Sequence, residues 1–204
     1  TSVLPIFVNK NIPVAFLVPT PTGYAKSIMD ATGDLRLFLK ENHIHDYSLQ
    51  AQGQENKVII KTFFVFPDHV QETYASLYRP ITKQGDPRIW FYKLKQYCRP
   101  RNLLAIVAYQ GALYLFNLSR KEIKNSFSDS NTVPASLLNQ IYLSLHSVAN
   151  ELLSRLREIH SMGFLPTVAH GDTGVGMTLE AHLGLSPNCN RAPDYKGIEL
   201  KAAR

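Results

Sequence analysis

The sequence predicts a mainly β first part, followed by a helix and the beginning of an α/β domain. Short runs of β-branched and aromatic residues, closed by proline or glycine, recur over the first 120 residues. A stripe of aliphatic residues at helical spacing follows between residues 138 and 159. The last 35 residues then change to glycine-rich turns and one short strand pattern.

The first part contains four expected strands and one helix. The strands are expected at residues 14–18, 57–66, 103–109 and 112–116. The last two flank Gln110-Gly111, a short turn signal that predicts a hairpin. Leu35, Phe38 and Leu39 share one face and predict a helix over about residues 33–42. Short strands separated by proline and glycine favour a barrel or a sandwich.

A change of character after residue 118 predicts the domain boundary. Ser119 and Glu122 have the spacing of a capping box and predict a short helix. The polar run that follows predicts a linker, and Pro134 suits the first turn of a further helix. The expected parts are a first domain at residues 1–125, a linker at 126–134 and a second domain at 135–204.

The helix after this linker has the most regular pattern in the chain. Its aliphatic residues are three or four positions apart, which places them on one face. They are Leu138, Ile141, Leu145, Val148, Leu152, Leu156 and Ile159. Such a stripe predicts core packing and no chemistry.

Composition excludes several classes of protein. With 45% hydrophobic and 19% charged residues, the 204-residue chain is expected to be folded rather than disordered. No apolar run approaches the roughly 20 residues that span a bilayer, and we recognise no secretory leader. Cys98 and Cys189 are too few for a disulfide scaffold and fit a reducing compartment. The pair His43 and His45 does not by itself predict a zinc site.

The net charge of +6 is concentrated in the first part of the chain. Residues 1–125 carry a net charge of +7, and residues 126–204 carry −1. Within residues 79–101, seven Lys and Arg residues alternate with aromatic ones, and Asp86 is the single acid. Such a stretch suits the neutralisation of phosphates and the reading of base edges. A solvated basic face is the alternative interpretation, and composition leaves both open.

Two carboxylates and a lysine near residue 200 form a first candidate site. Asp194 lies at a Pro-Asp turn, and Glu199 and Lys201 share one face of the strand pattern that follows. Carboxylate oxygens suit Mg²⁺, and an adjacent ammonium suits water positioning or charge stabilisation in phosphodiester hydrolysis. A surface strand with a salt bridge is the alternative interpretation of this D-x4-E-x-K spacing.

A glycine segment precedes this motif. Gly171, Gly174 and Gly176 run into a short expected helix, as in a phosphate cradle. The Lys-Ser/Thr pair of a P-loop is missing and no clear strand precedes the glycines, so a nucleotide cofactor is not expected. Glu180 is instead expected to present a third carboxylate from this helix.

Together these residues resemble the MvaI/BcnI-type restriction endonucleases and their relatives of the MutH mismatch-repair group. The runs TGVGMTLEAHLGL and APDYKGIELK carry the resemblance, with the motif order of that family. It implies an α/β PD-(D/E)xK nuclease fold in which Glu180, Asp194, Glu199 and Lys201 are catalytic, and in which Asp194 and Glu199 hold Mg²⁺. The resemblance covers about residues 167–204. Because little sequence follows Lys201, we expect a fragment of a longer enzyme that is inactive by itself.

The first part is similar in arrangement to the B3-like effector domain of EcoRII-type restriction enzymes. That resemblance implies a pseudobarrel with two arms that grip DNA, expected here near residues 20–26 and 83–88. Arg88 is the expected guanine reader, while Asp86 either accepts a hydrogen bond from cytosine or holds Arg88 in place. The other candidate DNA contacts are Tyr24, Lys26, Arg79, Lys83 and Lys93.

The resemblances imply a Type II, Type IIE-like restriction endonuclease. Its first domain is expected to recognise double-stranded DNA with a CC(A/T)GG-like target, and the intact enzyme to hydrolyse phosphodiesters with Mg²⁺. A prokaryotic cytoplasm, a monomeric state, and no membrane or nucleotide cofactor are expected with it. Two alternatives stay open: a DNA-binding transcriptional regulator without catalysis, and a MutH-like repair nickase.

Overall fold

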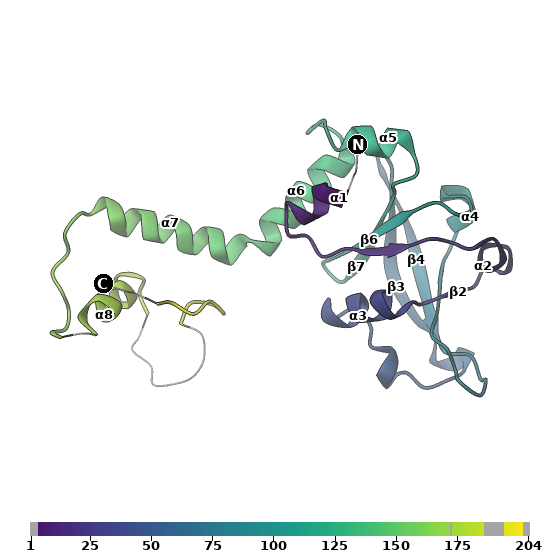
Figure 1. Ribbon diagram of the computed structural model, residues 1–204, viewed down its shortest axis with the longest axis horizontal. Coiled ribbons are helices and arrows are strands. Elements are labelled where there is room, and N and C mark those ends of the chain that lie inside the picture. Colours follow the sequence, from purple (N-terminus) through teal and green to yellow (C-terminus); the bar gives the residue numbers. More distant parts are fainter. Residues whose placement is uncertain (1–3, 172, 186–193, 202–204) are drawn as a thin grey trace. The chain divides into compact units, whose positions relative to one another are not determined.

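A curled, mixed sheet dominates the first half of the chain (Figure 1). The computed structural model describes residues 4–171, 173–185 and 194–201. Seven strands in this part of the chain have the order β1-β6-β7-β3-β4-β5-β2. Neighbouring strands are antiparallel, except that β3 and β7 are parallel. The strands are β1 Ala15–Leu17, β2 Met29–Asp30, β3 Val58–Val65, β4 Val70–Tyr78, β5 Arg88–Phe91, β6 Leu104–Tyr109 and β7 Ala112–Asn117.

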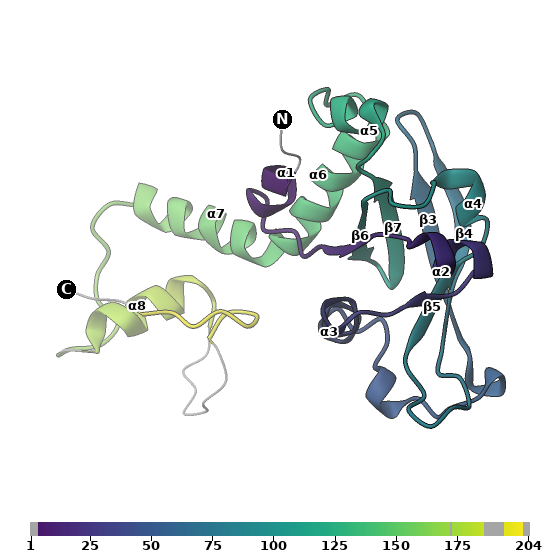
Figure 2. The ribbon, with the colours of Figure 1, turned by 45° about the vertical axis from the view of Figure 1, so that its right-hand side comes forward.

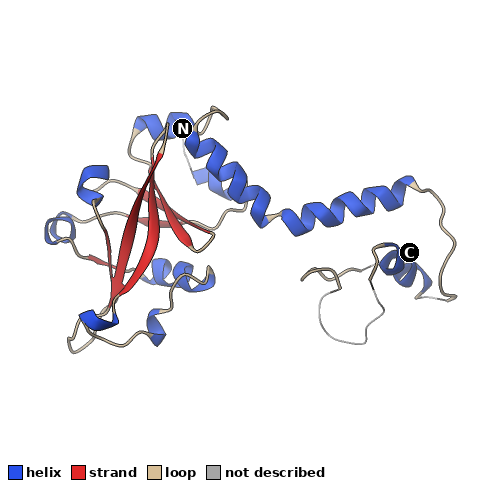
Figure 3. Ribbon diagram, turned by 180° about the vertical axis from the view of Figure 1, so that it is seen from behind, coloured by secondary structure: helices blue, strands red, loops and turns tan. Residues whose placement is uncertain are grey.

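The chain divides into two compact units, Thr1–Tyr142 and Leu143–Arg204. All seven strands belong to the first unit (Figure 3). The helices of the first unit are α1 Leu4–Val8, α2 Pro21–Lys26, α3 Gly33–Glu41, α4 Leu94–Tyr97, α5 Lys121–Ser126 and most of α6 Val133–Leu145, with short 3-10 turns at Tyr47–Leu49 and Gln54–Asn56. No helix of the described residues has the length and apolarity that a membrane span requires.

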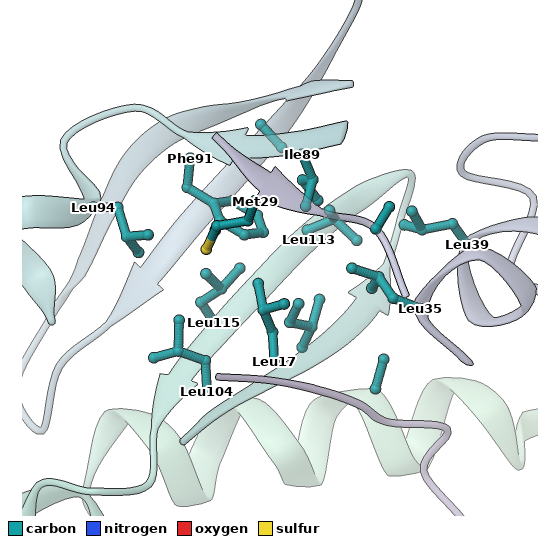
Figure 4. Packing of buried hydrophobic residues seen from close by; sticks show 14 of the residues in the cluster. Leu17, Met29, Leu35, Leu39, Ile89, Phe91, Leu94, Leu104, Leu113 and Leu115 are labelled. Atoms are coloured by element: carbon teal, nitrogen blue, oxygen red, sulfur yellow. The ribbon is translucent and has the colours of Figure 1, made fainter. Parts of the chain in front are cut away.

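Two hydrophobic cores lie on opposite faces of this sheet. Phe64 belongs to one core and its neighbour Val65 to the other, because successive side chains of a strand point to opposite faces. The first core packs α3 against residues from both halves of the sheet (Figure 4). The second core is covered by α1, α5 and α6, which gather on the side of the sheet away from α3 (Figure 2). Each fully buried aliphatic side chain contributes about 1.5–3 kcal/mol to folding.

The Tyr97 hydroxyl group connects the strands at the parallel pair. It lies 2.7 Å from the carbonyl oxygen of Leu115 and 3.0 Å from that of Val65, and it accepts a hydrogen bond from the backbone N–H of Asn117 at 2.9 Å. The ring stacks on Phe64 at 4.3 Å. Burial raises the pKa of this phenol well above its usual value, so the hydroxyl stays neutral and keeps its proton for the hydrogen bond.

Several sequence predictions are confirmed in the first unit. The expected strands correspond to β1, β3, β6 and β7, and the expected helix to α3. The turn between β6 and β7 places Gln110 at φ 49° and Gly111 at φ 73°, the left-handed geometry that a two-residue hairpin turn requires. Strands β2, β4 and β5 are additional elements that the sequence patterns did not predict.

The prediction of one helix for the aliphatic stripe is wrong. The stripe falls on two helices, α6 and α7 Ser147–Ser161, which are separated at His146. Leu138 and Ile141 pack in the second core of the first unit, whereas Leu152 packs in a separate cluster of the second unit. Leu145 is half exposed. One periodic pattern in the sequence therefore contributes residues to two separate hydrophobic cores.

The segment after β7 also differs from its expectation in detail. The short helix exists as α5, but Ser119 does not cap it, because its hydroxyl accepts a hydrogen bond from the backbone N–H of Leu103 at 2.8 Å. Within the expected linker, the N–H of Val133 donates to the carbonyl of Pro67 at 3.1 Å. The division into the two compact units falls between Tyr142 and Leu143, within α6.

The second unit is built from α7, α8 Gly174–His182 and a hairpin at residues 194–201. Its cluster is centred on Leu152 of α7, Leu183 after α8 and Tyr195 of the hairpin. Partly buried residues complete this cluster: Val148, Leu156, Ile159, Leu179, Leu185, Ile198 and Leu200. The hairpin therefore packs as a part of this unit.

We expect Tyr97→Phe to lower the free energy of unfolding of the first unit by about 1–3 kcal/mol, because it removes one buried hydroxyl and leaves its partners unsatisfied. Urea denaturation followed by the fluorescence of Trp90, the single tryptophan of the chain, measures this loss. Tyr92→Phe is the matched control, since Tyr92 is 46% exposed. Equal stabilities of the two variants would contradict the structural role of the Tyr97 hydroxyl.

Candidate functional site

A hollow of the first unit lies between the two predicted arms. It has a volume of about 700 Å³ and is lined by both edge strands of the sheet, β1 and β2, and by α2, which connects them. Thr82 and Arg88 line it from the second arm. We call this hollow the arm groove. Its remaining lining residues are Phe16, Leu17, Val18, Thr20, Thr22, Gly23, Lys26, Ile28, Met29, Asp30, Thr32, Tyr78 and Pro80.

The first arm is a helix rather than an open loop. Pro21 starts α2, and the Thr20 hydroxyl caps it by accepting a hydrogen bond from the N–H of Gly23 at 3.1 Å. Lys26, in the last turn, is exposed and lines the arm groove. Tyr24 packs inward instead, and its hydroxyl donates to the carbonyl of Cys98 at 2.7 Å. Lys26 is therefore available to a ligand in the groove, whereas the hydroxyl of Tyr24 is used within the fold.

Arg88 is held in the arm groove by an acid from the neighbouring strand. In the pairing of β2 with β5, Asp30 lies directly opposite Arg88, and their side chains form an ion pair. Asp30 is 71% exposed and Arg88 28% exposed. The sequence proposed Asp86 for this role, or for a base contact. Asp86 is exposed in the second arm, and the partner of Arg88 is Asp30.

Arg79 braces the second arm from within. Its Nε donates to the carbonyl oxygen of Gly85 at 2.9 Å, and a terminal nitrogen donates to that of Gln50 at 3.1 Å. These bonds occupy the guanidinium with backbone acceptors. Lys83, at the tip of the same arm, is exposed. Of these two candidate phosphate contacts, Lys83 is the accessible one.

Lys93 lies outside the lining of the arm groove. It adopts a left-handed backbone conformation with φ 57° before α4, and its ammonium lies 5.6 Å from the ring centre of Tyr92. The ring of Tyr92 in turn stacks on Tyr74. The basic stretch thus distributes its charges over several parts of the surface.

The D-x4-E-x-K motif of the second unit forms a tight hairpin. Tyr195 and Ile198 pair through backbone hydrogen bonds of 2.9 and 2.8 Å. The turn between them holds Lys196 at φ 45° and Gly197 at φ 95°. The pairing extends over a single bridge, shorter than the strand that the sequence predicts.

This hairpin brings Asp194 next to the backbone that carries Glu199 and Lys201. Oδ2 of Asp194 accepts a hydrogen bond from the N–H of Leu200 at 2.9 Å. Glu199 and Lys201, which flank Leu200, are both exposed. Three of the four predicted catalytic residues are therefore held in one local structure.

Glu180 lies on α8 and is half buried. The helix starts at Gly174, where an added Cβ would approach the carbonyl oxygen of Ala169 to 2.5 Å. The Thr178 hydroxyl fixes the same loop, because it donates to the carbonyl of Gly174 at 2.6 Å and accepts from the N–H of Val168 at 3.1 Å. Gly174 thus serves close packing between the loop and the helix.

The described side chains do not form a complete Mg²⁺ site. Asp194 and Glu199 supply the carboxylate oxygens that this ion prefers, but no three His, Cys, Asp or Glu side chains in the described ranges group closely enough to hold a metal ion. His45 is used elsewhere, since its Nε2 lies 3.2 Å from Oε1 of Gln50 and burial lowers its pKa.

The second unit is similar to a known family of nucleases. Residues 153–204 match the sequence model of the MvaI/BcnI restriction endonuclease family. The match covers about a quarter of the chain and includes α8 and the hairpin. The match shows that this segment is similar to restriction endonucleases. No curated protein and no solved structure matches the chain significantly.

We expect Arg79→Met to lower the free energy of unfolding of the first unit by about 1.5–3 kcal/mol, because it removes two charge-assisted hydrogen bonds to the backbone. Lys83→Met, at the exposed tip of the arm, should change the stability by less than about 0.5 kcal/mol. Urea denaturation of both variants gives the comparison. A larger loss for Lys83→Met than for Arg79→Met would show that the bracing contacts are assigned to the wrong residue.

Proposed function

We propose that the chain forms part of a sequence-specific restriction endonuclease. In this enzyme the first unit binds double-stranded DNA, and the second unit carries the hydrolytic residues. The hairpin is the observation that carries this proposal. Within the segment that matches the nuclease family, the carboxylate of Asp194 accepts a hydrogen bond from the backbone N–H of Leu200, which lies between Glu199 and Lys201. Local structure thus supports the residue set that the motif suggests.

The arm groove is the proposed DNA interface of the first unit. Lys26 and Lys83 are exposed cations on the two arms, suited to phosphate contacts. Arg88 is oriented by Asp30 and presents the planar fork that matches the acceptors of guanine. Phe16 and Ile28 are partly exposed in the same groove, where an apolar surface suits contact with a thymine methyl group. Guanine and thymine contacts agree with a CC(A/T)GG-like target.

Asp194 and Glu199 are the proposed Mg²⁺ ligands, with Glu180 as the third carboxylate. A divalent metal ion, when bound, activates water and stabilises charge on the phosphodiester. In the chain itself, the N–H of Leu200 holds the carboxylate of Asp194 toward the backbone between Glu199 and Lys201. Lys201, two positions after Glu199 and exposed like it, supplies a positive charge. We propose that its ammonium orients water or stabilises the developing charge.

We expect Arg88→Ala to weaken binding to a CC(A/T)GG duplex by about 1–3 kcal/mol more than binding to a scrambled duplex, because base contacts carry discrimination. Lys26→Ala should weaken both alike and reduce the salt slope by about one. Fluorescence anisotropy at two salt concentrations measures all four affinities.

The outcome of this experiment distinguishes the proposed roles. If both variants lose the same affinity for both duplexes, then Arg88 is not a base reader. If the parental chain fails to bind duplex DNA at low salt, the proposed function of the arm groove is wrong.

We expect Asp194→Asn and Lys201→Ala to reduce Mg²⁺-dependent cleavage by at least about a hundredfold, as for other groups that act on the reacting phosphate. The variants are made in the longer enzyme of which this chain is expected to be a fragment. DNA affinity should stay within about twofold, since the arm groove belongs to the first unit. A gel assay of cleavage and an anisotropy titration give the two readouts. Parental cleavage rates in Asp194→Asn would contradict the assignment. Binding without cleavage by the longer enzyme, of which this chain is expected to be a fragment, would favour a DNA-binding regulator.

A further inference from the structure

The hairpin of the second unit needs support from outside itself. Its pairing consists of one bridge between Tyr195 and Ile198. Two-stranded hairpins are at best marginally stable in water, even when they are longer than this one. A site that depends on Asp194 and Glu199 needs positions held to about half an ångström. Contacts with the rest of the unit must therefore supply the rigidity.

Glu151 of α7 makes the polar contacts of this kind. Its Oε1 accepts a hydrogen bond from the hydroxyl of Tyr195 at 2.9 Å, and its Oε2 lies 2.6 Å from the ammonium of Lys196. Arg155, one turn further along α7, lies 3.5 Å from Oε1. These hydrogen bonds from Lys196 and Tyr195 lower the pKa of Glu151. Both oxygens of one carboxylate thus hold two consecutive residues of the hairpin.

Apolar packing supports the same contact. Tyr195 is only 3% exposed and packs with Leu152 and Leu183. The guanidinium of Arg155 lies 5.9 Å from the centre of the Tyr195 ring, and it donates a hydrogen bond to the carbonyl of Leu183 at 3.2 Å. The ring is therefore fixed along its body by α7 and by the residue after α8, while Glu151 fixes its hydroxyl end.

The ion pair between Glu151 and Lys196 contributes little to the rigidity of the hairpin by itself. Glu151 is 36% exposed and Lys196 57% exposed, and pairs of that kind contribute about 0–1 kcal/mol. The hydrogen bond from the buried Tyr195 is the stronger element, because the removal of its acceptor leaves a polar group without a partner at a packed position.

We propose that Glu151 is a positioning residue that fixes the hairpin bearing Asp194, Glu199 and Lys201 against α7. Tyr195 and Lys196 directly follow Asp194. When Glu151 fixes these two residues, it therefore also fixes Asp194, whose carboxylate accepts the hydrogen bond from the N–H of Leu200. Glu151 lies just before the segment that matches the nuclease family. The inference rests on the proposed hydrolytic function of the hairpin.

Hydrogen exchange of single backbone amides in the full chain, followed by NMR, tests this role. In Glu151→Ala, exchange at Leu200 should accelerate about tenfold, because the hairpin opens locally. Glu151→Gln keeps an acceptor for Tyr195 and should recover a large part of the protection. Tyr195→Phe removes the hydroxyl alone and should reproduce most of the acceleration. Glu158→Ala, an exposed carboxylate on the same helix, is the control for loss of one negative charge.

The location of the accelerated exchange distinguishes a positioning role of Glu151 from a contribution to the stability of the whole unit. Acceleration confined to the hairpin, with α7 and α8 unchanged, supports the inference. Unchanged exchange at Leu200 in Glu151→Ala, the same acceleration in Glu158→Ala, or equal acceleration throughout α7 and α8 would overturn it.

A second readout applies to the cleavage reaction. Glu151→Ala should lower kcat about tenfold or more while KM for DNA changes little, because the groups that act on the phosphate are displaced. A tenfold rise in KM with kcat unchanged would contradict the positioning role. If the longer enzyme, of which this chain is expected to be a fragment, shows no Mg²⁺-dependent cleavage, the proposed hydrolytic function fails. The exchange measurement on the chain still decides whether Glu151 fixes the hairpin.

Discussion

Parallel pairing between β3 and β7 is the constraint on which the first unit depends. It joins two antiparallel halves of the sheet, β1-β6-β7 and β3-β4-β5-β2. Because the sheet curls, both of its edge strands contribute to the lining of the arm groove. The hydroxyl of Tyr97 lies between the carbonyl oxygens of Val65 and Leu115, one from each half. A buried hydrogen bond remote from the groove thus helps to determine the geometry of the groove.

The sequence predicts elements whose pattern is local, and it fails where partners are distant. The helix with Leu35 and the hairpin around Gln110 follow from spacing and turn chemistry alone. Strand β4 carries Gln, Glu and Ser, and its buried positions are Thr73, Ala75 and Leu77, so its composition does not mark it as a strand. Most of the aliphatic stripe packs in a core as predicted, with Leu145 as the exception, but periodicity contains no information on which core each residue joins. His146 separates residues that serve different units.

The same limit applies to the charged residues. The excess of Lys and Arg in residues 79–101 is a property of the sequence, but the use of each charge depends on the fold. Arg79 binds backbone carbonyls, Arg88 pairs with Asp30, and Lys93 lies near an aromatic ring. The pairing of Asp30 with Arg88 joins residues on strands far apart in sequence, whereas the sequence pattern offered only Asp86, either for this role or for a base contact. A basic stretch therefore gives the net charge of a surface without identifying its phosphate contacts.

The two parts of the candidate nuclease site differ in the range of the interactions that build them. Asp194 and the backbone at Leu200, between Glu199 and Lys201, meet through a turn of a few residues, so their spacing in the sequence already implies proximity. Glu180 comes from α8, and its position relative to the hairpin depends on how Leu179, Leu183 and Tyr195 pack. Glu151 of α7 makes the contact between this helix and the hairpin. The motif does not reveal this contact, because the partners of Glu151 are Tyr195 and Lys196, which the motif does not specify. The motif supplies the reactive groups, and the surrounding helices supply the rigidity with which such groups must be held.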